Sequence, residues 1–115
     1  MFDFQKLEVY KKAKTFCHEM TSLIKKSTFD KVTCDQLRRA SFSIMLNIAE
    51  GTSRFSNKDK RHFMVISRGS AFECVAILEY LKDNNEISEK IYNCYFDELE
   101  ELSKMLYSFI RRLED

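Results

Sequence analysis

Two glutamates in the middle of the chain, Glu50 and Glu73, could do chemistry as a pair, because paired carboxylates can act as general acid and general base. Neither has a histidine or cysteine at a spacing that would support such a reaction. The chain also has no phosphate-loop pattern and no Gly-x-Ser-x-Gly nucleophile turn. We therefore expect no catalytic residues and predict that the protein is not an enzyme.

Metal binding is the next function to consider, because the chain contains acidic residues, histidines and cysteines. Asp59 and His62 have the acid-x-x-His spacing of di-metal helical bundles, but such a site needs a second copy and two further glutamates. The four cysteines are Cys17, Cys34, Cys74 and Cys94. They form no Cys-x-x-Cys pair, and no Cys/His clustering suits zinc. We expect reduced thiols that pack as small apolar side chains, with no metal and no other cofactor.

A basic cluster interleaved with aromatic residues favours phosphate binding. The cluster consists of Arg54, Lys58, Lys60, Arg61 and Arg68. Phe55 and Phe63 alternate with these cations, and a helix expected to start at Ser56 would present free backbone N–H groups beside them. The pattern predicts salt-sensitive contacts with a nucleic-acid backbone rather than base readout. The alternative is a solvated basic loop without a ligand.

Other polar residues lie on helix faces that should be partly buried. Arg39, Ser43 and Asn47 recur every four residues beside an apolar stripe. The candidate structural network comprises Arg38, Arg39, Asn47, Glu50, Ser70 and Glu73. We expect Arg38 or Arg39 to bond to one of the two glutamates and so to fix the register of two helices. The alternative is a small-ligand site built around the same glutamates.

Four amphipathic helices should position these residues. Apolar residues recur at intervals of three and four over residues 4–26, 33–51, 56–82 and 89–113. Thr33, Ser56 and Ser88 each begin a helix-capping pattern. Gly51 should end the second helix in a left-handed conformation. Gly69 lies inside the third helix, where glycine costs about 1 kcal/mol relative to alanine, so we expect a neighbouring backbone to approach it closely.

The short connectors between these helices require an up-down-up-down arrangement. We predict an all-α protein in which residues 1–115 form a single antiparallel four-helix bundle. The absence of proline and the presence of only two glycines agree with long helices. The second helix is apolar on a second face, at Phe42, Leu46 and Ala49, which indicates either a central position or a contact with another subunit.

The net charge of +1 conceals an asymmetry along the chain. Residues 1–68 contain 14 basic and 7 acidic side chains, whereas residues 69–115 contain 5 and 11. This distribution suits head-to-tail self-association or an anionic partner, unless the charges mix within the bundle. No apolar run approaches the roughly 18 residues of a membrane span, and the N-terminus does not resemble a signal peptide. We expect a cytoplasmic protein that does not bind a membrane.

The central residues resemble a known family. The resemblance is carried by Arg38-Arg39-Ala40-Ser41, Ser43-Ile44, Asn47-Ile48-Ala49-Glu50-Gly51, Arg54, Ser56, Phe63, Arg68-Gly69-Ser70 and Glu73. It is extended by Phe4, Lys6-Leu7, Val9-Tyr10 and Ala13 near the N-terminus. The chain is similar to the four-helix bundle proteins encoded by intervening sequences of bacterial 23S rRNA genes, often labelled S23 ribosomal protein. The same family includes the accessory variability proteins of diversity-generating retroelements.

This resemblance implies a bundle that assembles into a ring-shaped homopentamer without enzymatic activity. It also implies association with RNA or DNA and, in the retroelement branch, a reverse transcriptase as partner. Two hypotheses remain open at this point. The protein either binds nucleic acid electrostatically, or it acts as a protein-interaction adaptor without direct nucleic-acid binding.

Overall fold

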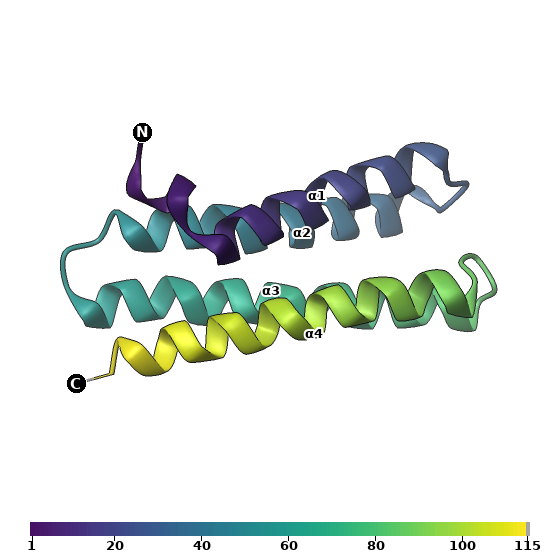
Figure 1. Ribbon diagram of the computed structural model, residues 1–115. Helices are drawn as coiled ribbons and strands as arrows, with labels where there is room; N and C mark the ends of the chain where they lie inside the picture. Colours follow the sequence, from purple (N-terminus) through teal and green to yellow (C-terminus); the bar gives the residue numbers. More distant parts are fainter. Residues whose placement is uncertain (115) are drawn as a thin grey trace.

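The computed structural model describes residues 1–114, which form four long helices and one short 3-10 turn (Figure 1). The elements are η1 (Asp3–Lys6), α1 (Glu8–Lys26), α2 (Lys31–Thr52), α3 (Asn57–Asp83) and α4 (Glu89–Arg112). Consecutive helices run in opposite directions, so both ends of the chain and the α2–α3 turn lie at one end of the molecule (Figure 1). The predicted all-α, antiparallel four-helix bundle is confirmed. None of these helices combines the length and apolar character needed to cross a membrane.

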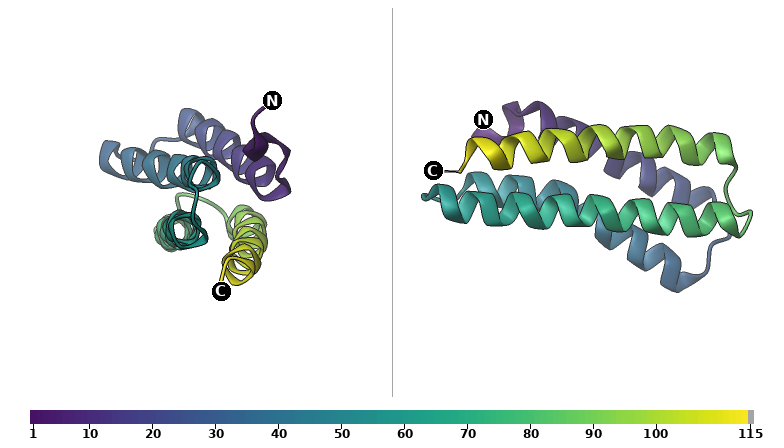
Figure 2. Two further views of the ribbon diagram at one scale, coloured as in Figure 1. Left: turned by 90° about the vertical axis from the view of Figure 1, so that its left-hand side faces the viewer. Right: turned by 90° about the horizontal axis from the view of Figure 1, so that it is seen from below.

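The four helices form an elongated body of 45 × 23 × 21 Å. Viewed along its length, the body has α1 beside α2 and α4 beside α3 (Figure 2). The packing is most extensive between α2 and α3 and sparsest between α1 and α4. The α1–α4 boundary, here called the α1–α4 seam, is therefore the weakest lateral join in the bundle.

The helix starts follow local capping chemistry. The Ser56 and Ser88 hydroxyls accept hydrogen bonds from the Asp59 and Ile91 amides, both at 3.1 Å, so these two predicted caps are confirmed. The cap predicted at Thr33 is wrong, because α2 begins two residues earlier and Asp30 caps it, accepting the Thr33 amide at 2.7 Å. That bond lowers the pKa of Asp30, and its negative charge suits the positive end of the helix dipole.

The first helix also starts later than residue 4, where it was predicted to begin. Residues 3–6 form the separate turn η1, and Leu7 is extended, with φ −74° and ψ 130°. The polypeptide therefore changes direction at Leu7 before α1 starts at Glu8. The effect is to lay η1 against the end of α2 as well as against α1.

Gly51 does not end α2 in a left-handed conformation, contrary to prediction. The helix continues through Thr52, and neither glycine has a positive φ. Gly51 is buried against α3 instead. A Cβ atom there would lie 2.8 Å from Met64 Cε, 3.2 Å from Phe63 Cβ and 3.3 Å from the Lys60 carbonyl oxygen. Glycine is thus needed because two helices approach each other closely at this point.

Gly69 shows the opposite situation. It is exposed, and a Cβ atom at this position would meet nothing within 4 Å. The prediction that a neighbouring backbone approaches Gly69 closely is therefore wrong for the single subunit. Nothing inside the chain explains why a mid-helix position of α3 holds the residue that weakens helices most after proline.

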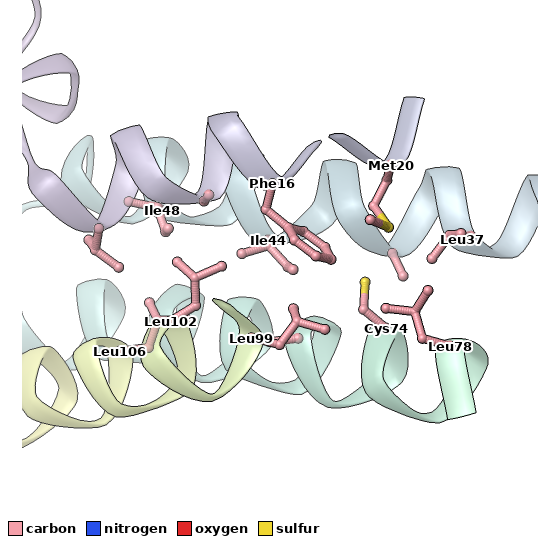
Figure 3. Close-up of a cluster of buried hydrophobic side chains, with 14 of the residues drawn as sticks. Phe16, Met20, Leu37, Ile44, Ile48, Cys74, Leu78, Leu99, Leu102 and Leu106 are labelled. Carbon is pink, nitrogen blue, oxygen red and sulfur yellow. The ribbon is translucent and has the colours of Figure 1, made fainter. Parts of the chain in front are cut away.

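The core is a continuous layer of apolar side chains that point inward from all four helices. Figure 3 shows its central members, which are Phe16, Met20, Leu37, Ile44, Ile48, Cys74, Leu78, Leu99, Leu102 and Leu106. Burial raises the pKa of Cys74 to about 12, so this thiol stays protonated and packs as an apolar group. Cys17 is also buried, whereas Cys34 is half-buried and Cys94 is exposed. All four thiols are free, but the expectation of core thiols holds only for Cys17 and Cys74.

Candidate functional site

A polar network joins α2 to α3 along the surface of the bundle. Arg39 Nη2 lies 2.6 Å from Glu73 Oε2 and 3.1 Å from Gln36 Oε1. This is one of the pairings considered from the sequence. The two charged side chains are 56% and 46% exposed, so the pair contributes about 0–1 kcal/mol to stability. Its main effect is to align the two helices rather than to hold them together.

Hydroxyl groups continue this network toward the core. Ser70 Oγ donates to Ser43 Oγ at 2.7 Å, and Asn47 Nδ2 donates to the same Ser43 hydroxyl at 2.9 Å. The fully buried Ser67 hydroxyl donates to the Ile44 carbonyl oxygen at 2.7 Å. Sequence reasoning missed Ser67, although a serine in the apolar stripe of α3 is the kind of signal that marks such a bond. The Ser70–Ser43 and Ser67–Ile44 bonds join the two helices and set the register of α2 against α3, whereas the Asn47–Ser43 bond lies within α2.

Glu50 and Arg38 lie outside this network. Glu50 forms an ion pair with Arg54 one turn further along the chain, while Glu73 binds Arg39. The two glutamates therefore each have their own arginine and do not face one another as a carboxylate pair. Arg38 is exposed and forms no ion pair with any residue of the described chain.

The small-ligand hypothesis required a pocket shared by Glu50 and Glu73. An open groove of about 640 Å³ lies between η1 and the end of α2, and Glu50, Asn47 and Leu46 contribute to its wall. Glu73 does not line it. Within residues 1–114, no three His, Cys, Asp or Glu side chains gather at a distance suited to a metal ion.

Three of the five predicted nucleic-acid-binding residues have structural contacts inside the subunit. The Arg54 guanidinium lies 4.6 Å from the centre of the Phe63 ring, in addition to its pairing with Glu50. Arg61 Nη1 donates to the Leu113 carbonyl oxygen at 3.0 Å and so caps the end of α4.

Arg68 fills the boundary between α3 and α4. Its Nε donates to the Ser103 carbonyl oxygen at 3.3 Å, and its guanidinium lies over the rings of Phe72 and Tyr107 at 4.9 and 5.5 Å. Because Arg61 and Arg68 bind neutral groups, both keep an uncompensated positive charge. Arg54 does not, since Glu50 balances it.

Lys58 and Lys60 remain available near the α2–α3 turn. Lys58 is exposed and Lys60 half-buried, and neither forms an ion pair among the residues described. Phe55 precedes them at the tip of the turn with its side chain completely exposed, at 102% of the reference area. We call Phe55, Lys58 and Lys60 the turn surface. It combines a free aromatic face with two cations at the start of α3.

Sequence reasoning missed one further group of ionisable residues, at the α1–α4 seam. Glu19 Oε1 and Glu98 Oε2 are both buried there and have no hydrogen-bond donor among the described residues. Burial and the adjoining Glu19 carboxyl raise the pKa of Glu98 to about 8. Beside them, Lys12 Nζ binds Glu101 Oε1 at 2.9 Å. The available signal was a glutamate in the apolar half of α1, next to Met20.

Comparisons with known proteins agree with the four-helix fold described above. Residues 5–108 match the family model described as "23S rRNA-intervening sequence protein". The crystal structure of a protein of unknown function from the S23 ribosomal protein family, from Bacteroides thetaiotaomicron VPI-5482, is similar with a TM-score of 0.85. The two chains are 27% identical, and the match covers 89% of this chain and 97% of the other. No curated protein matches. The chain thus belongs to the 23S rRNA-intervening sequence protein family.

Proposed function

We propose that this protein is a non-enzymatic homo-oligomer that associates with RNA or DNA through the turn surface. The observation that carries this proposal is the complete exposure of Phe55 beside Lys58 and Lys60 at the start of α3. An apolar ring that contacts nothing in its own subunit is costly to expose to water. A nucleic-acid base is a suitable cover for it, because stacking does not depend on base identity.

The neighbouring groups suit the phosphates of the same strand. Lys58 and Lys60 supply cations that form no ion pair among the described residues. The Ser56 hydroxyl occupies the Asp59 amide, so the remaining first-turn amides of α3 are the ones available to an anion. Arg61 and Arg68 add positive charge without being neutralised by a carboxylate. Contacts of this type favour a single strand or loop and weaken as salt is added.

Self-association strengthens this proposal, because two lysines per copy bind only weakly. We propose the ring of five copies that the family resemblance implies, in which five turn surfaces act on one strand. The exposed apolar residues of α2 support contacts between copies in the ring. Phe42 and Leu46 are 44% and 54% exposed in the single subunit.

Variants of the turn surface test the nucleic-acid proposal. We expect Phe55→Ala to weaken binding of a fluorescein-labelled single-stranded RNA about tenfold, because one base loses its stacking partner. We expect Lys58→Gln combined with Lys60→Gln to reduce the dependence of log affinity on log salt by about 1.4, for two lost phosphate contacts. Fluorescence anisotropy at several salt concentrations measures both quantities.

Lys25→Gln, at an exposed position near the end of α1 and so at the opposite end of the bundle from the turn (Figure 1), is the matched control and should bind as the wild type does. Binding that is unchanged in both turn-surface variants would contradict the assignment of this site.

A second candidate is an adaptor role without direct nucleic-acid binding, for example with a reverse transcriptase as partner. It is favoured by the internal contacts of Arg54, Arg61 and Arg68, which leave only two fully available cations in the cluster. Purified oligomer that fails to bind RNA or DNA at low salt would support this candidate. Tight binding with no partner present would rule it out.

A further inference from the structure

The outer face of α3 carries a second helix-packing stripe that stays exposed among the described residues, although Phe72 lies beneath the Arg68 guanidinium and Asp83 Oδ1 lies 4.0 Å from Lys82 Nζ. Its members recur at alternating spacings of four and three, and every one of them is exposed. We call this the outer stripe: Lys58, His62, Val65, Gly69, Phe72, Ala76, Glu79 and Asp83. Such spacing is typical of a seam between two helices. The core-facing residues of α3 form a separate set, so the helix is patterned for two neighbours on opposite sides.

The composition of the outer stripe changes along the helix. Its middle is apolar or small, with Val65 and Phe72 53% and 56% exposed. Its start is basic at Lys58, and its end is acidic at Glu79 and Asp83. Gly69 lies in the apolar middle with open space above it. A glycine that weakens its own helix and contacts nothing is explained if another helix crosses at that point.

We propose that two copies of this chain pack α3 against α3 in antiparallel orientation about a two-fold axis. The outer stripe is complementary to its own reverse. In an antiparallel pair centred between Ser70 and Ala71, the facing residues are Lys58 with Asp83, His62 with Glu79, Val65 with Ala76, and Gly69 with Phe72. The two-fold axis forms each of these pairs twice.

The facing residues match one another in size or in charge. The Phe72 ring of one copy covers Gly69 of the other, where the free space is available. The large Val65 faces the small Ala76, so the two helices approach without a gap. Lys58 faces Asp83 with opposite charge, whereas a parallel pair would place like charges side by side. Because the outer stripe is complementary to itself in size and charge, we infer that the partner it binds is a second copy of the chain.

The length of α3 allows a substantial contact. Its 27 residues extend about 40 Å, nearly the full length of the bundle. Ile66 and Tyr80 flank the outer stripe and add apolar surface to it, at 38% and 57% exposure. Together with Val65 and Phe72, they form the apolar part of the face that the second copy would cover.

This inference rests on the proposed self-association but is separable from ring formation. Subunits in a ring contact each other head to tail through two different patches, whereas a two-fold contact uses one patch twice. The α3 pairing therefore joins two chains, or two rings, and doubles the number of copies. In the paired state Lys58 faces Asp83 of the second copy, so Phe55 and Lys60 are the free part of the turn surface. The slope change of about 1.4 expected for the double lysine variant applies to the unpaired protein and falls to about 0.7 in the pair.

The test is the mass in solution of Gly69→Leu, measured by light scattering over a concentration series without nucleic acid. Leucine is compatible with the helix, and its Cβ atom would meet nothing within 4 Å in the described subunit, but its side chain fills the space required by Phe72 of the second copy. We expect the mass to fall to half that of the wild type while the circular dichroism stays helical. Asn93→Leu, at an exposed position of α4, is the matched control and should keep the wild-type mass.

A charge exchange tests the orientation independently of glycine. Lys58→Glu should halve the mass by placing two acidic groups together, and adding Asp83→Lys should restore it. This pair of variants also decides the matter if Gly69→Leu fails to fold. An oligomer with unchanged mass in both Gly69→Leu and Lys58→Glu overturns the α3 contact and leaves self-association intact. A wild-type protein that is monomeric at every concentration overturns both.

Discussion

Replacing Gly51 by leucine should lower the free energy of unfolding by about 2 kcal/mol. The new side chain would enter a space already filled by Met64, Phe63 and the Lys60 carbonyl group, which lie within 3.3 Å of the position of Cβ. Overpacking of this kind costs about 3 kcal/mol, and the higher helix propensity of leucine offsets about 1 kcal/mol of that cost. Urea denaturation of dilute protein measures the change.

Gly69→Leu, measured at a concentration low enough to dissociate the proposed α3 contact in the wild type as well, is the matched control for this prediction, since it makes the same chemical change in the next helix. At Gly69 a Cβ atom meets nothing within 4 Å, so only the gain in helix propensity remains. The two variants should therefore shift the midpoint of denaturation in opposite directions. Equal losses at both positions would show that the close approach at Gly51 does not govern stability.

The second large effect concerns pH and arises at the α1–α4 seam. Two ionised carboxylates cannot donate a hydrogen bond to each other, so the buried oxygens of Glu19 and Glu98 are satisfied only if they share a proton. The raised pKa of Glu98, at about 8, expresses this preference. A proton shared by Glu19 and Glu98 thus stabilises the α1–α4 seam at neutral pH, and this proton is released in mildly alkaline solution.

The direction of the pH dependence follows from the proton count in each state. The folded protein keeps the Glu98 proton up to about pH 8, whereas the unfolded chain releases it near the ordinary value of 4.5. The stabilisation is therefore complete below pH 4.5, is lost progressively as the pH rises to about 8, and changes no further above that. Because solvent screens this partly exposed seam, we expect a total loss of about 1–2 kcal/mol.

Glu98→Gln should remove most of this pH dependence. A glutamine amide can donate to the Glu19 carboxylate at any pH, so the variant should exceed the wild type in stability at pH 8.5. The other charged groups acting on Glu98 are Lys12 and Glu101, which remain in place. Glu100→Gln, at an exposed position on the same helix, is the control. Identical slopes of stability against pH in wild type and Glu98→Gln would refute the shared proton.

The sequence predicted the helices well because their signals are local. Apolar spacing and the serine caps at Ser56 and Ser88 depend only on residues within one or two turns. The start of α2 was misplaced because Asp30 and Thr33 are both good caps, and only the path of the preceding connector selects between them. Gly51 was misread because close approach to α3 involves residues that follow it by more than a turn.

The candidate site was harder to predict because its properties depend on tertiary neighbours. Composition placed Arg61 and Arg68 in a basic cluster, but their bonds to Leu113 and Ser103 come from α4 or its end, more than 30 residues away. The Glu19–Glu98 pair likewise forms only when the first and last helices meet. The pairing of Arg39 with Glu73 was accessible, because the polar spacing on α2 and α3 already suggested facing stripes.

The measurement that tests the central proposal most directly is the solution mass of the wild-type protein by light scattering, with and without a structured RNA that contains single-stranded loops. We predict an oligomer at low salt whose mass increases when RNA is added, and a progressive loss of that increase as salt is raised. An oligomer whose mass is unaffected by RNA at low salt would contradict nucleic-acid association, and a monomer would contradict the assembly on which it depends.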